Sequence, residues 1–140
     1  AEQVRKLKSK FGNKPLSDRD ISSHCKNFPG FLGVFMQNSA IPTRDGCFVM
    51  NNDILGNAGI HWIAGIKRGK NIYIYDSFAR TNRNLLPIFT QTMVSRGYKI
   101  HNADLSDQDQ YGNKSVDCGH RSISALMLYK DYGIATFMRL

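Results

Sequence analysis

Cysteine, proline and tryptophan are scarce in this sequence. Its 140 residues include only three cysteines, four prolines and one tryptophan. So few cysteines, in an odd number, exclude a disulfide scaffold and favour reduced thiols, as found in the cytosol or nucleus. There is no proline-rich linker, internal repeat or shift of composition, so we expect one domain over residues 1–140.

Long apolar runs are also missing. No run approaches the roughly 18–20 apolar residues that span a bilayer. The first residues are charged where a secretory signal would be apolar, so we expect no membrane association and no secretion. Apolar residues nevertheless make up 41% of the chain and charged residues 21%, which excludes a disordered or low-complexity protein.

Acidic residues are outnumbered by basic ones. Nineteen Lys and Arg against eleven Asp and Glu give a formal net charge of +8. The basic N-terminal segment 1–16 contains five of these cations: Arg5, Lys6, Lys8, Lys10 and Lys14. Such a segment can neutralise the phosphates of a nucleic acid, or it can be a solvated, frayed tail. The charge alone leaves both interpretations open.

Sequence patterns predict helices and strands in mixed order. Ser17 and Asp20 resemble a capping box and predict a helix over residues 17–25. Strands are expected at 31–36, 47–50 and 98–100, a hairpin within 59–76, helices over 84–96 and 118–133, and a polar loop over 104–117. This order predicts an α+β domain with a central mixed sheet.

The hairpin within residues 59–76 brings two polar residues together. If Arg68 and Gly69 form a two-residue loop, His61 stands directly opposite Asp76 on one face of the hairpin. The Cβ atoms of such a pair lie roughly 4.5–5.5 Å apart.

A cysteine completes a constellation with this pair. Cys118 opens a predicted helix, where free backbone N–H groups and the helix dipole stabilise a thiolate. A nucleophile, a base and a carboxylate that orients the base are the parts of thiol acyl-transfer catalysis. The preceding loop holds Gln108 and Gln110, and either side chain can supply the oxyanion donor.

Other residues carry weaker signals. A side chain at Gly119 could obstruct the approach of a substrate carbonyl, so we assign Gly119 and Trp62 to substrate binding, although Trp62 also fits a core position. His24 and Cys25 have no second pair at metal-ligand spacing, so no metal site is expected. A papain-type order would recruit Cys25 with His61, but nothing places Cys25 at a helix start.

His101 and His120 are expected on the surface or in loops. His120 lies two residues after Cys118 and can approach the site.

The ordered set of motifs resembles the adenain-type cysteine proteases, which share a fold with SUMO proteases. It comprises His61-Trp62, Tyr75-Asp76-Ser77, Gln110 and Asp117-Cys118-Gly119, preceded by Phe28-Pro29-Gly30-Phe31. The resemblance covers about residues 17–133 and looks closest to proteases of virophages and polinton-like elements. It implies an adenain-like (papain-like) cysteine protease fold with the nucleophile at a helix N-terminus.

The resemblance also implies roles and partners. Cys118 would be the nucleophile, His61 the general base and acid, Asp76 the orienting carboxylate, and Gln110 an oxyanion donor with Gln108 as its competitor. The substrate would be a viral capsid or core precursor cut near small residues, in the virion or the infected cell. We expect a monomer that needs no cofactor for its chemistry and that DNA can activate. The alternatives are an isopeptidase for ubiquitin-like modifiers and a non-catalytic basic DNA-binding capsid protein.

Overall fold

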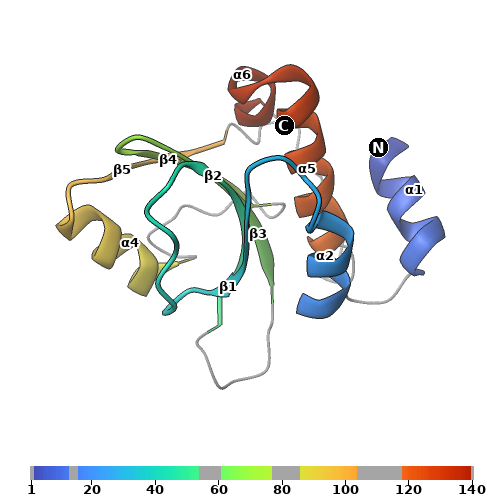
Figure 1. Ribbon diagram of the computed structural model, residues 1–140, viewed down its shortest axis with the longest axis horizontal. Coiled ribbons are helices and arrows are strands. Elements are labelled where there is room, and N and C mark those ends of the chain that lie inside the picture. Colours follow the sequence, from blue (N-terminus) through green and yellow to red (C-terminus); the bar gives the residue numbers. More distant parts are fainter. Residues whose placement is uncertain (1, 13–15, 54–60, 77–85, 104–117, 140) are drawn as a thin grey trace.

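The computed structural model describes residues 2–12, 16–53, 61–76, 86–103 and 118–139 (Figure 1). In chain order its elements are α1 (Glu2–Phe11), α2 (Asp18–Cys25), β1 (Phe31–Met36), β2 (Gly46–Asn51), β3 (Trp62–Arg68), β4 (Asn71–Tyr75), α4 (Pro87–Ser95), β5 (Lys99–Asn102), α5 (Cys118–Tyr132) and α6 (Ile134–Met138). The predicted loop at 104–117 lies outside the described residues.

The five strands form one mixed sheet in the order β1-β2-β3-β4-β5. The central strand β3 is antiparallel to both β2 and β4, whereas β1 pairs with β2, and β5 with β4, in parallel. This arrangement confirms the predicted α+β class with a central mixed sheet.

Helices cover both faces of this sheet (Figure 1). On one face α1, α2, α5 and α6 pack over a core that includes Val49, Ile66 and Ile123. On the other face α4 packs over a second cluster, which includes Phe48 and Ile63. Neighbouring residues of β2 and β3 enter opposite clusters because side chains alternate along a strand. Strands β2 and β3 are therefore buried on both faces and form a rigid support for the residues at their ends.

Helix α2 begins as its sequence predicts. The Ser17 hydroxyl accepts the backbone N–H of Asp20 at 3.1 Å, and the Asp20 carboxylate accepts the backbone N–H of Ser17 at 3.1 Å. This reciprocal capping box satisfies two backbone donors that a helix start otherwise leaves without partners. It also fixes where the chain enters α2, directly after Leu16.

The β3–β4 hairpin differs from its predicted register. Arg68 pairs with Asn71, so the two loop residues are Gly69 and Lys70 rather than Arg68 and Gly69. Gly69 has a φ of +58°, a left-handed conformation that glycine adopts without steric cost and that tight hairpin turns require. The pairing therefore moves by two residues, which keeps every side chain on its predicted face. His61 and Asp76 become diagonal neighbours instead of directly opposed residues.

Within the basic N-terminal segment, Glu2–Phe11 forms helix α1 and not a frayed tail. Leu7 of α1 is only 3% exposed and belongs to the core cluster shared with α5. Arg5, Lys6 and Lys10 are exposed. Helix α1 therefore combines an apolar contact with the core under α5 and a solvent-facing row of cations.

Candidate active site

Cys118 is the first residue of α5, and its side chain is 4% exposed. The first turn of a helix has backbone N–H groups without helical partners, and the helix dipole makes this end positive. Both effects stabilise a thiolate. Helix α5 packs along β3, which places Cys118 beside the start of that strand.

His61 and Asp76 meet at the same end of the hairpin. His61 directly precedes β3 and Asp76 directly follows β4, and these two strands are antiparallel neighbours. The Nε2 atom of His61 lies 2.5 Å from Oδ1 of Asp76, and the two residues are 2% and 1% exposed. A bond of this kind is charge-assisted when the imidazole is protonated. Asp76 therefore fixes the ring and leaves Nδ1 for another partner.

The imidazole of His61 interacts with both the carboxylate and the thiol. Burial alone lowers the pKa of His61, but hydrogen bonds to Asp76 and Cys118, together with their charges, outweigh it and raise the pKa above its usual value. Because Asp76 occupies Nε2, Nδ1 is the nitrogen that remains for Cys118. This environment favours a thiolate–imidazolium pair, the reactive state of a cysteine nucleophile.

The backbone of Trp62 ties the thiol to β3. The Trp62 N–H donates to Sγ of Cys118 at 3.3 Å, and the Trp62 carbonyl accepts the hydroxyl of Ser122 at 3.0 Å. Ser122 is fully buried and lies one turn after Cys118 on the same face of α5. Sequence reasoning missed both bonds, although the i, i+4 spacing of Cys118 and Ser122 was a usable signal.

The predicted substrate-binding residues Trp62 and Gly119 both have packing roles. The indole N–H of Trp62 donates to the carbonyl of Leu16 at 2.8 Å, and the residue is 8% exposed. A Cβ added at Gly119 would lie 3.1 Å from Leu16 Cβ and 3.2 Å from Trp62 Cδ1. Glycine at 119 thus allows the first turn of α5 to approach these side chains. Their contact with substrate stays a prediction.

The predicted oxyanion donors lie outside the described residues. Gln110 and its alternative Gln108 belong to the stretch 104–117, as does Asp117. The choice between the two glutamines therefore stays open. Of the predicted catalytic set, the structure brings Cys118, His61 and Asp76 together.

The other two thiols have a different environment. Cys25 and Cys47 are 0% and 1% exposed and belong to the core. Burial raises the pKa of Cys25 to about 11, and burial together with the nearby Cys25 raises the pKa of Cys47 to about 12. Cys25 also ends α2 instead of starting it. These facts disfavour the papain-type alternative, in which Cys25 would be the nucleophile.

We predict that iodoacetamide leaves Cys25 and Cys47 unmodified in the folded protein at neutral pH. Their thiols are buried and protonated, and the thiolate is the reactive form. Mass spectrometry of tryptic peptides before and after addition of guanidinium chloride measures this. Rapid modification of either residue without denaturant would contradict the prediction.

His101 and His120, which were expected on the surface or in loops, are half-buried and fully buried. His120 is fully buried, and its Nε2–H donates to the carbonyl of Gly12 at 3.1 Å, so its predicted surface position was wrong. His101 is half-buried on β5, where its ring stacks on Tyr73 at 4.8 Å between centroids. Both contacts join segments far apart in sequence, which explains why local patterns did not reveal them.

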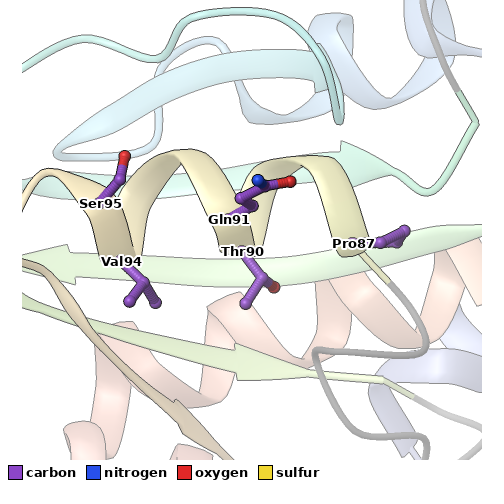
Figure 2. A pocket seen from close by; sticks show the side chains of 5 residues that line it. All are labelled: Pro87, Thr90, Gln91, Val94 and Ser95. Carbon is purple, nitrogen blue, oxygen red and sulfur yellow. The ribbon is translucent and has the colours of Figure 1, made fainter.

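A surface pocket lies away from this constellation. Side chains of α4 line it, namely Pro87, Thr90, Gln91, Val94 and Ser95 (Figure 2). Helix α4 covers the face of the sheet opposite to the one covered by α5 (Figure 1). The pocket is therefore separate from Cys118.

Among the described residues, no group of three or more His, Cys, Asp or Glu side chains is placed to hold a metal ion. Within the same part of the chain, no helix is long and apolar enough to cross a membrane.

Comparisons with family models and with curated proteins give no match. Among solved structures, the chain is similar to the crystal structure of the ASFV pS273R protease, with a TM-score of 0.53 and 14% identity over 90% of this chain and 61% of that one. A selenomethionine crystal structure of the same protease gives a TM-score of 0.49 and 14% identity, over 91% of this chain and 64% of that one. This chain thus spans less than two thirds of that protease. At such low identity the likeness concerns the fold alone: this chain and the ASFV pS273R protease share a fold.

Proposed function

We propose that this protein is a cysteine endopeptidase. The observation that carries the proposal is the position of the His61–Asp76 pair beside Cys118 at the first residue of a helix: Nε2 of His61 lies 2.5 Å from Asp76, and Sγ of Cys118 accepts the N–H of Trp62, the residue after His61. The likeness in fold to the ASFV pS273R protease supports it. We place the protein with the adenain-type enzymes of small DNA viruses, on the motifs around His61 and Cys118.

The reaction follows from the positions of these groups. The Cys118 thiolate attacks the scissile carbonyl carbon, a C–S bond forms and the oxyanion accepts hydrogen bonds. The His61 imidazolium then gives its proton to the leaving amine, and the C–N bond breaks. Neutral His61 next removes a proton from water, whose oxygen attacks the thioester carbon; the C–S bond then breaks, which releases the carboxylic acid and regenerates the Cys118 thiolate beside the His61 imidazolium. Asp76 holds the ring through Nε2 in both stages.

The oxyanion donors and the substrate are part of the same proposal. The Cys118 backbone N–H and the side chain of Gln110, or of Gln108, would bind the oxyanion. The substrate would be a viral capsid or core precursor cut near small residues, in the virion or the infected cell. The protein would act as a monomer and would need no cofactor for the chemical step.

A peptide library tests the proposed activity without a known substrate. Peptides from a digested proteome are incubated with the native protein, and new amino termini are identified by mass spectrometry. The Cys118→Ala variant serves as the blank. We expect a recurring set of new termini near small residues in the native sample alone. Identical termini in both samples, or none in either at high protein concentration with and without DNA, would contradict the proposal.

DNA is the second proposed partner, on the strength of the net charge of +8 and the exposed cations of α1. We predict that Arg5→Ala with Lys6→Ala weakens binding to a short duplex. Each lost phosphate contact should reduce the slope of log K against log salt by about 0.9. The matched control is Arg68→Ala with Lys70→Ala, two exposed cations at the hairpin turn.

Fluorescence anisotropy at several salt concentrations measures this binding. An unchanged slope for the α1 pair would contradict a role of that helix. A reduced slope for the hairpin pair alone would place the DNA-binding surface at the β3–β4 turn and not on α1. The non-catalytic alternative is a DNA-binding protein without peptidase activity. It predicts that Cys118→Ala binds DNA as the native protein does, and that the native protein cleaves no peptide of the library.

A further inference from the structure

Leu16 contacts the neighbours of both reacting side chains. Its carbonyl accepts the indole N–H of Trp62 at 2.8 Å. Its side chain lies against Gly119, so closely that an added Cβ there would be 3.1 Å from Leu16 Cβ and 3.2 Å from Leu16 Cδ1. Trp62 directly follows His61, and Gly119 directly follows Cys118. Leu16 therefore contacts the strand that holds the base and the helix that holds the nucleophile.

The surrounding N-terminal segment fixes Leu16 in this position. Leu16 directly precedes Ser17, the N-cap of α2, whose capping box sets the path of the chain. On the other side, the carbonyl of Gly12, just after α1, accepts the Nε2–H of His120. Leu16 itself is 4% exposed and belongs to the same core cluster as Trp62 and Cys118. The first turn of α5 is thus held at residues 119 and 120 by the segment that precedes α2.

The bond that depends on this packing is the one from the Trp62 N–H to Cys118 Sγ. This bond, 3.3 Å long, joins the start of β3 to the first residue of α5, so its length changes when α5 shifts against β3. The Ser122 hydroxyl holds the next turn of α5 on the Trp62 carbonyl. The Trp62 ring also lies against Gly119 directly, and Leu16 contacts both residues, so these three residues pack together at the first turn of α5.

We propose that Leu16 is a positioning residue of the protease site, which sets the distance between Cys118 and His61 by packing on Trp62 and Gly119. This inference rests on the proposed function. The contacts that carry this role are those of Leu16 with Trp62 and Gly119, so we expect its truncation to affect the chemical step and leave substrate affinity largely unchanged. A misplacement of about 1 Å in a reacting group can reduce a rate by about 100-fold.

The test compares two truncations of the same residue type. Leu16→Ala removes side-chain atoms next to Gly119, whereas Leu86→Ala removes them in the second core cluster, under α4. Leu86 is 0% exposed, so its truncation is at least as destabilising. Two assays are run on each variant: cleavage of a peptide from the library, which gives kcat and KM, and alkylation of Cys118 by iodoacetamide at about pH 6, which gives the labelling rate. Labelling of Cys25 and Cys47 reports loss of fold in the same samples.

We expect Leu16→Ala to lower kcat and the alkylation rate by about tenfold or more, with KM changed less than about twofold. Leu86→Ala should leave both rates within about twofold of native. Leu16→Met, which conserves volume, should restore most of the activity. Equal losses in the two Ala variants, or native rates in Leu16→Ala, would overturn the proposal.

A second variant decides the question if Leu16→Ala exposes Cys25 and Cys47 and is therefore unfolded. Trp62→Phe removes the indole donor to Leu16 but keeps an aromatic ring and the backbone N–H to Cys118. Slower alkylation of Cys118 in a folded Trp62→Phe supports the proposal, and a native rate overturns it. If the native protein itself shows no His61-dependent alkylation, the proposed function fails before the role of Leu16 is reached.

Discussion

Asp76→Asn is expected to lower kcat by about 10⁴-fold, the loss seen when the orienting carboxylate of a catalytic triad is neutralised. The carboxylate accepts from Nε2 of His61 at 2.5 Å, so this nitrogen carries a proton and Nδ1 is the nitrogen that acts as the base. An asparagine amide can donate to Nε2 instead, which stabilises the wrong tautomer and no longer supports the imidazolium.

The same variant should change the pH profile in a defined direction. Interaction with Asp76 is one of the causes that raise the pKa of His61, and burial opposes it. Loss of the carboxylate therefore lowers the pKa of His61. Because the thiolate–imidazolium pair disappears as His61 loses its proton, the alkaline limb of kcat/KM should move to lower pH.

Asp45→Asn is the matched control for this variant. Asp45 is exposed and accepts the backbone N–H of Gly69 at the opposite end of the hairpin. Its neutralisation should leave kcat and the pH profile unchanged. A native profile in Asp76→Asn, or the same shift in Asp45→Asn, would contradict the orienting role of Asp76.

Cys118→Ala is expected to have the largest effect, a loss of cleavage by roughly 10⁶-fold, comparable to removal of the nucleophile in a serine protease. The fold should remain, because a buried cysteine packs as a small hydrophobic residue. Adding His61→Ala should cause almost no further loss, since the two residues act as a unit.

Cys25→Ala provides the matched control, because it removes an equally buried thiol from the same core cluster. Cleavage should survive in this variant, with a reduced free energy of unfolding. Activity and urea unfolding of the three variants are measured in parallel. Residual cleavage by Cys118→Ala above the background of the double variant would show that another nucleophile acts.

Much of the site could be predicted because it depends on local patterns. Alternation of side chains puts His61 and Asp76 on one face of a hairpin in either register, so a two-residue error in the turn did not separate them. The start of a helix at Cys118 follows from the change in periodicity after a polar stretch. The capping box at Ser17 is a short-range pattern and was correctly located.

The missed features depend on how distant segments pack. The bonds from Trp62 to Cys118, from Ser122 to Trp62, and from Trp62 to Leu16 join β3, α5 and the N-terminal segment. Their geometry follows from the angle and depth at which α5 lies on the sheet, which no single segment encodes. The burial of His120 against Gly12 has the same origin.

The two helices that were not predicted differ in the signal they offered. In α1 the apolar residues Val4, Leu7 and Phe11 follow a helical spacing. The many lysines of the same segment instead indicated a nucleic-acid-binding or solvated tail. Helix α6 has only five residues, too few for a periodic pattern, and it is held by the buried Phe137. The helical spacing of α1 is therefore present in the sequence, whereas α6 is too short to show one.

The most direct test of the central claim is the rate at which iodoacetamide modifies each cysteine at about pH 6, where an ordinary thiol with a pKa near 8.5 is almost fully protonated. The native protein and His61→Ala are compared by mass spectrometry. We predict rapid modification of Cys118 alone in the native protein and slow modification in His61→Ala. Equal rates for Cys118 in the two proteins, with or without DNA, would contradict a thiolate–imidazolium pair and with it the proposed protease site.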